Sequence, residues 1–153
     1  MTRVSALSVV LLSAWLGAAI LVATVVAPAA FKVLPTRTLA GAVVGQVLPV
    51  IFISGLIVAA IVTLVNVRAP QERSWLASGL LALMLLGCVV AQFIIAPRIE
   101  VARAAIGGPV ESIDASDPRR VQFGKLHAFS VLWMGVAMVG AGGAIVQKLT
   151  QRT

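Results

Sequence analysis

Four long stretches of the chain contain almost no charged side chain, and polar residues gather in the short segments between them. Each stretch meets the roughly 20 apolar residues that cross a bilayer as a helix. This pattern predicts an all-α fold, an integral membrane four-helix bundle, formed by residues 1–153 as a single transmembrane domain. The stretches without Lys, Arg, Asp or Glu are 4–30, 38–67, 74–97 and 126–147.

Turn and capping residues place the ends of the four helices. Pro28 is expected to bend or end the first helix and Pro49 to kink the second, because proline lacks the N–H that a helix uses. Gly107-Gly108-Pro109 stops the third, and Asp117-Pro118 is typical of an N-cap followed by proline. The predicted helices cover about 4–31, 38–67, 74–103 and 118–147, with a loop at 69–73.

A weak internal repeat relates the two halves of the chain. Val25-Val26-Ala27-Pro28 resembles Ile94-Ile95-Ala96-Pro97, and Gly45-Gln46-Val47-Leu48 resembles Gly124-Lys125-Leu126-His127. The hypothesis is that the chain forms two similar helical hairpins, related by an axis along the membrane normal.

Small residues at four-residue spacing are expected to pack helices closely inside the bundle, with homodimerisation as the alternative. The candidate pairs are Ser13 with Gly17, Gly41 with Gly45, and Ala137 with Ala141.

Composition agrees with a membrane protein. Of 153 residues, 60% are hydrophobic and 11% charged, and the mean hydropathy is +1.07. A net charge of +7 would suggest nucleic acid in a soluble protein. In this chain, basic residues flanking spans meet lipid headgroups and set topology. The expected partner is therefore the lipid bilayer and not nucleic acid.

The first stretch is too long for the apolar part of a signal peptide, which has 7–15 residues, so we expect it to be retained. Five basic residues are expected on the side of the membrane that holds both termini, and seven on the opposite side. If Arg119, Arg120 and Lys125 face the bundle, the division becomes five against four. We then expect cytoplasmic termini in a multi-pass protein of a bacterial inner membrane.

The polar start of the fourth helix is the most unusual element. Arg120, Phe123 or Gly124, His127 and Ser130 recur at three-to-four spacing, so they share one helix face, whereas Lys125 points elsewhere. Charges this close to a bilayer face protein, water or headgroups. His127 either binds a ligand or hydrogen-bonds a carbonyl. The candidate ligand-binding residues at this polar end are Arg37, Arg120, Lys125 and His127.

A second candidate is a set of soft metal ligands. Met84 and Cys88 are spaced i, i+4 on the third helix, and Met134 is expected at a depth similar to that of Cys88. Thioether and thiolate groups suit Cu(I), although Met is also ordinary core filler. The candidate metal ligands are Met84, Cys88, His127 and Met134.

No catalytic constellation is present in the sequence. It contains no Ser-His-Asp set, phosphate loop or zinc spacing, and one His argues against bis-histidine haem. The sequence favours a protein that is not an enzyme over an enzyme. A catalytic role would need a cofactor, and the sequence does not identify one.

Several short motifs together resemble the transmembrane protein 205-like family. They are Trp15-Leu16-Gly17, Ala27-Pro28-x-x-Phe31, Ala40-Gly41-x-x-x-Gly45, Arg68, Ala96-Pro97 and Phe123-x-x-Leu126-His127. The resemblance implies a four-span protein of unassigned function, with a loose link to metal resistance or drug handling. The copper resistance protein D group is a more distant likeness. Its members carry a His near the first-helix Trp, where this chain has none.

Three functional hypotheses follow. A binder or transporter of a small ligand or metal predicts a polar cavity that reaches His127. An accessory subunit of a larger membrane complex predicts no internal cavity and an outer face matched to a partner. A haem or quinone-linked enzyme predicts a Soret band. A homo-oligomer is compatible with each of them.

Overall fold

Every regular element of the computed structural model is a helix over the described residues, 3–68 and 74–150. This confirms the all-α prediction, and the predicted loop at 69–73 lies outside the described residues. The elements are α1 (Arg3–Leu21), η1 (Val22–Val26), α2 (Ala27–Val33), α3 (Arg37–Arg68), α4 (Trp75–Val89), η3 (Val90–Ile95), α5 (Ala96–Ile106), η4 (Val110–Ser112) and α6 (Pro118–Thr150).

Four helical runs are long and apolar enough to cross a membrane. The first combines α1, η1 and α2, and the third combines α4, η3 and α5. With 29 to 33 residues each, the runs are about 44–50 Å long at 1.5 Å per residue, which exceeds the hydrocarbon core. The chain is a multi-pass membrane protein surrounded by a lipid bilayer. The spans are Ser5–Val33, Arg37–Arg68, Trp75–Ile106 and Pro118–Thr150.

Two π-helical turns, η1 and η3, each precede an Ala-Pro pair. Pro28 has no N–H, and its ring crowds the carbonyl of Thr24 in a regular α-helix. In the wider turn the N–H of Ala27 bonds the carbonyl of Val22, five residues back, and Ala96 bonds Ala91 in the same way. Helix 1 therefore continues beyond Pro28 to Val33, where the sequence suggested a bend or an end.

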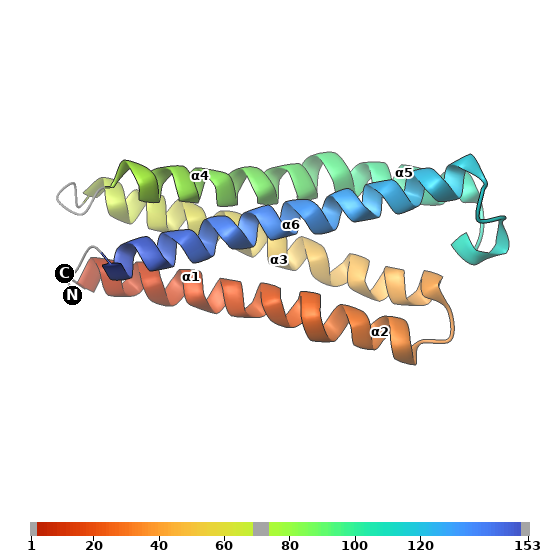
Figure 1. Cartoon of the computed structure of the whole chain (residues 1–153), viewed down its shortest axis with the longest axis horizontal. Helices are drawn as coiled ribbons and strands as arrows, with labels where there is room; N and C mark the ends of the chain where they lie inside the picture. The colour runs from red at the N-terminus through yellow and green to blue at the C-terminus, as the bar shows by residue number, and fades with distance from the viewer. Residues whose placement is uncertain (1–2, 69–73, 151–153) are drawn as a thin grey trace.

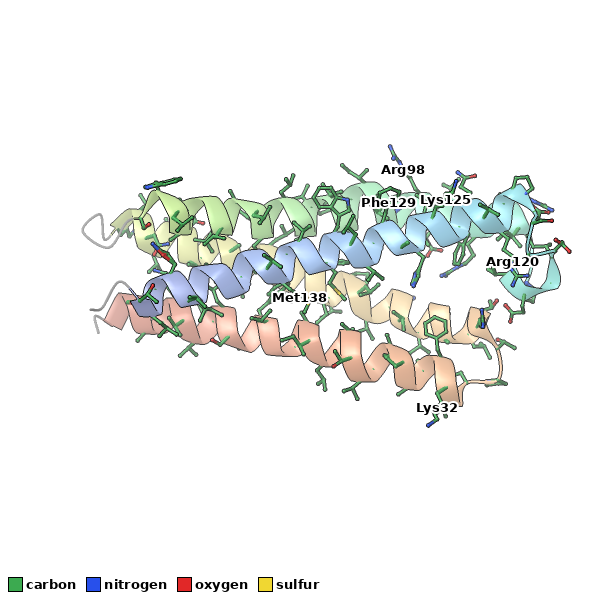
Figure 2. All side chains as sticks on the ribbon, viewed as in Figure 1. Lys32, Arg98, Arg120, Lys125, Phe129 and Met138 are labelled. Atoms are coloured by element: carbon green, nitrogen blue, oxygen red, sulfur yellow. The ribbon has the colours of Figure 1, made fainter. Side chains whose placement is uncertain are left out.

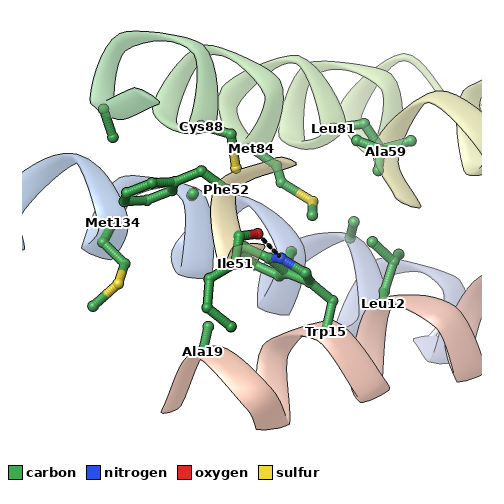
Figure 3. Packing of buried hydrophobic residues seen from close by; sticks show 14 of the residues in the cluster. Leu12, Trp15, Ala19, Ile51, Phe52, Ala59, Leu81, Met84, Cys88 and Met134 are labelled. Carbon is green, nitrogen blue, oxygen red and sulfur yellow. Dashed lines mark hydrogen bonds between the residues drawn. The ribbon is translucent and has the colours of Figure 1, made fainter. Parts of the chain in front are cut away.

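The apolar core lies in the half of the bundle nearer the two described chain ends. Trp15 of α1 is 4% exposed and donates its indole N–H to the carbonyl of Ile51 at 2.8 Å (Figure 3). Phe52 and Leu12 are fully buried beside it. At the same end, Lys148 of α6 donates to Asn66 of α3 at 2.8 Å, and Gln147 of α6 donates to Ser74 at 3.0 Å. The Trp15–Ile51 bond holds α1 on α3 inside the first hairpin (α1 to α3), and the Lys148–Asn66 bond joins this hairpin to the second (α4 to α6).

Glycines allow α4 and α6 to approach each other closely. A Cβ on Gly140 of α6 would lie 2.7 Å from the Leu80 carbonyl oxygen and from the Met84 nitrogen. A Cβ on Gly87 of α4 would lie 2.8 Å from backbone atoms of Trp133 and Ala137. Backbone atoms cannot move aside like a flexible side chain, so both positions require glycine.

The predicted small-residue pairs have different roles. Ala137 and Ala141 are fully buried, as expected for close packing. Ser13 and Gly17 are exposed, and a Cβ on Gly17 would meet nothing within 4 Å. The packing prediction is therefore wrong for Ser13–Gly17, whose side of α1 faces outward.

The described chain begins and ends at the same end of the bundle (Figure 1), as four spans require. Arg119 and Lys125 are exposed, and only Arg120 is half-buried inside the bundle. The assumption that all three face the interior is wrong, because Arg119 instead pairs with Asp117 at 2.7 Å. The count of basic residues therefore gives no support for cytoplasmic termini.

Candidate functional site

The two hairpins separate toward the end of the bundle that carries the α2–α3 turn (Figure 1). In that half α2 packs on α3, and α5 packs on α6. A cavity of about 590 Å³ lies between the two pairs, within the range usual for small-molecule sites. Its lining follows α3 from Arg37 to Phe52, about 22 Å along the helix. Arg37 is exposed at the mouth, and Phe52 is 1% exposed at the base.

One face of α6 forms a wall of the cavity. Arg120, Phe123, Gly124, His127 and Ser130 all line it. Their three-to-four spacing predicted this shared face, and the prediction is confirmed. The wall changes from a guanidinium at the mouth to a buried hydroxyl at the base, with His127 half-buried between them.

The structure brings three of the four candidate ligand-binding residues to this cavity. Arg37, Arg120 and His127 line it. Lys125 does not, and its side chain extends from the outside of α6 (Figure 2). Two residues along a helix turn the face by about 200°, which is why Lys125 and His127 lie on different sides.

Glycines on α3 leave the space that the cavity occupies. A Cβ on Gly45 would meet nothing within 4 Å, and one on Gly41 would lie 3.8 Å from the Arg103 guanidinium. This pair therefore opens a cavity and does not join two helices, contrary to the packing prediction. Gly45 and Gly124, matched in the internal repeat, line the cavity from opposite hairpins.

Three arginines and two glutamates are the charged residues of the lining. Arg103 pairs with Glu100 at 3.3 Å and lies over the ring of Phe123, 5.9 Å from its centre. One positive and one negative charge of the lining therefore balance each other directly.

A strap formed by residues 107–117 crosses the mouth of the cavity. Gly107 begins it with φ of +72°, a left-handed conformation that glycine adopts without strain. The hydroxyl of Thr38 on α3 accepts the Val110 N–H at 3.1 Å and donates to Glu111 at 2.8 Å. Through this hydroxyl the strap is attached to the first hairpin.

The strap is also attached to the second hairpin. Arg120 of α6 donates to the carbonyl of Ile113 at 2.7 Å, and Figure 2 shows Arg120 between α6 and the strap. The hydrogen bond from Thr38 is the main reason why the pKa of Glu111 lies below its usual value, and the charge of Arg120 contributes. Glu111 of the strap therefore already has a hydrogen-bond donor on the first hairpin and a positive charge on the second.

Arg37 and Arg120 are the two lining arginines without a carboxylate partner within 4.0 Å in the described part of the chain. Arg120 uses one of its five N–H donors on Ile113. The mouth of the cavity therefore carries two guanidinium groups that can each bind an anion.

The candidate metal ligands are divided between two environments. Met84, Cys88 and Met134 belong to the buried apolar core, while His127 lines the cavity. The side chains of Met84 and Met134 extend away from one another (Figure 3). No group of three or more His, Cys, Asp or Glu side chains suited to a metal ion occurs within residues 3–68 and 74–150.

Sequence reasoning did not place Glu100, Arg103 and Glu111 in the site. The i, i+3 spacing of Glu100 and Arg103 could have indicated one polar face of α5. Nothing in the sequence indicates that Glu111 contacts Thr38, 73 residues earlier, because hydrophobic periodicity does not determine the path of a loop.

Comparison with known protein families identifies one that matches this chain. Residues 10–107 match the model of the family described as Domain of unknown function (DUF4149). The chain belongs to this family. The DUF4149 match covers the first hairpin from Val10 and the first arm of the second hairpin (α4, η3 and α5) up to Gly107. It therefore includes the α3 and α5 walls of the cavity and leaves α6 outside. It does not support the narrower resemblance to transmembrane protein 205-like or copper resistance protein D proteins. No curated protein and no solved structure matches the chain.

Proposed function

We propose that the chain is a membrane-embedded binding protein that holds one small amphipathic ligand between its two hairpins. The observation that carries this proposal is the cavity, about 590 Å³ in volume, which reaches His127. The binder hypothesis predicts such a cavity, whereas the accessory-subunit hypothesis predicts a bundle without one.

The lining supports an amphipathic ligand more than a metal ion. Apolar side chains such as Val44, Leu48 and Phe52 form the deep part, and charged groups gather at the mouth. Ligand sites are typically apolar, with a few polar groups that fix the orientation of the ligand. The three sulfur-containing candidates lie in the core and not on this lining.

The test is a comparison of two glycine variants. Gly45→Leu places a side chain in the cavity, where a Cβ has open space. Gly79→Leu places the same side chain on an exposed face of α4, also with open space around the Cβ and away from the lining. Native mass spectrometry of the detergent-purified proteins, followed by organic extraction, measures the ligand that each retains.

We expect the native chain and Gly79→Leu to retain the same small molecule and Gly45→Leu to lose it. Equal retention by both variants would overturn the proposal, since a ligand in this cavity competes with the new side chain. A colourless preparation without a Soret band would remove the haem alternative.

A further inference from the structure

We propose that the ligand is an anionic amphiphile whose carboxylate or phosphate binds Arg37 and Arg120 while its apolar chain extends toward Phe52. This inference rests on the proposed function and names the ligand class of the same cavity.

The first step concerns charge. Of the five charged lining residues, Glu100 is paired with Arg103 at 3.3 Å, and Glu111 accepts the Thr38 hydroxyl at 2.8 Å. The side chain of Arg37 has no hydrogen bond or ion pair among the described residues, and that of Arg120 bonds one carbonyl. The Thr38 hydroxyl is neutral, so Glu111 still offsets one of these two arginines, and the mouth is left with one net positive charge.

The second step concerns chemistry. Guanidinium groups bind carboxylate and phosphate through two parallel N–H···O bonds, and these charge-assisted bonds are stronger than neutral ones. Arg37 begins α3 and Arg120 lies in the first turn of α6. The mouth therefore combines arginines with the N-terminal ends of two helices, where negative charge is favoured.

The third step concerns shape. The lining continues about 22 Å along α3 from Arg37, through Gly41, Gly45 and Leu48 to Phe52. A small hydrophilic anion would leave this apolar part without contacts, whereas an alkyl chain fills it. Burial of each CH₂ contributes about 0.8 kcal/mol, so the chain supplies affinity and the arginines supply orientation.

The experiment measures binding of radiolabelled hexadecanoic acid and hexadecanol to the purified chain in a neutral detergent, at a pH where the carboxylate is ionised. The variants are Arg37→Gln with Arg120→Gln, the conservative Arg120→Lys, the matched control Lys125→Gln, and Gly45→Leu. Lys125 carries the same charge on the same helix but lies outside the lining. Circular dichroism and thermal unfolding check that each variant is folded.

We expect the double arginine variant to lose about tenfold or more in affinity for the acid and to bind the alcohol as before. Arg120→Lys should retain part of the acid affinity because its charge remains, and Lys125→Gln should retain all of it. Gly45→Leu should weaken both probes. Competition by phosphatidic acid that exceeds competition by unlabelled hexadecanoic acid would assign the anion to a bilayer phospholipid, and the reverse to a free acid.

Two failures can be distinguished. Acid binding that is insensitive to both arginines, with both probes still lost in Gly45→Leu, overturns the anionic class and leaves the binding function standing. Probe binding that is unchanged in Gly45→Leu overturns the binding function itself. If the native chain binds neither acid nor phosphatidic acid, the inference is wrong.

Discussion

A single hydroxyl, that of Thr38, connects the strap to the first hairpin. It accepts one hydrogen bond from Val110 and donates one to Glu111, so it uses both of its capabilities. Because it stabilises the ionised carboxylate, it lowers the pKa of Glu111. A group with a lowered pKa stabilises the folded state above its unfolded pKa, and this contribution is lost as the pH falls through the lowered value.

The variant Thr38→Val is therefore expected to raise the pKa of Glu111 toward the ordinary value for a glutamate. Valine has a similar shape and cannot donate. Carboxyl-selective NMR titration of the detergent-solubilised protein measures this pKa. Asp114 is an internal control, because its pKa is lowered mainly by Ser116 and should not change. An unchanged pKa of Glu111 would contradict the strap geometry.

At the scale of elements, α4 and α6 are held together by glycines that face backbone of the other helix. Gly140→Ala should destabilise the bundle by about 1–3 kcal/mol, because the added methyl overpacks an interface that cannot yield. Gly135→Ala is the matched control on α6, since its Cβ would meet nothing within 4 Å. Thermal unfolding in detergent should show a lower Tm for Gly140→Ala alone. Equal Tm values would exclude the close approach.

Helix boundaries are the part of this fold that the sequence predicts well. Asp117 was expected to cap α6, and its carboxylate accepts the Arg119 N–H at 2.8 Å. The shared face of Arg120 and His127 was predicted too, because three-to-four spacing is a local property of a helix. Both the cap and the shared face depend only on residues close in sequence, so the sequence alone predicts them.

What depends on a neighbouring helix was not predicted. Gly17 and Gly140 look alike in sequence, yet only Gly140 is pressed against another backbone. The empty space beside Gly45 likewise depends on where α5 and α6 lie. A small residue permits close packing or a cavity, and only the tertiary arrangement decides between them.

At the scale of the whole molecule, the chain places the α2–α3 turn and the strap at one end of the bundle and both described chain ends at the other (Figure 1). The four spans cross in alternate directions, so the mouth of the cavity opens toward a single side of the membrane. A ligand that enters through the mouth arrives from that side.

Single cysteines test this topology in a Cys88→Ser background. Pro35 and Ala115 are exposed at the mouth end, and Val67 is exposed near the other end. The three variants are Pro35→Cys, Ala115→Cys and Val67→Cys. A membrane-impermeant maleimide applied to right-side-out and inverted vesicles should label the first two from the same side and the third from the opposite side. Labelling of positions 35 and 115 from different sides would contradict the four-span arrangement.

The π-helical turns also change which residues share one face of a span. Each π turn adds one residue without a corresponding rotation, so the phase of every residue beyond it shifts by about 100°. A helical wheel drawn through the third span would therefore misplace Glu100 and Arg103, which follow η3. A related chain with one residue fewer at 90–95 and a regular α-helix there would keep the same α5 side chains toward the cavity, because the residue that it lacks adds no rotation. The π turn is therefore the place in this span where the chain can gain or lose a residue without any change in the lining.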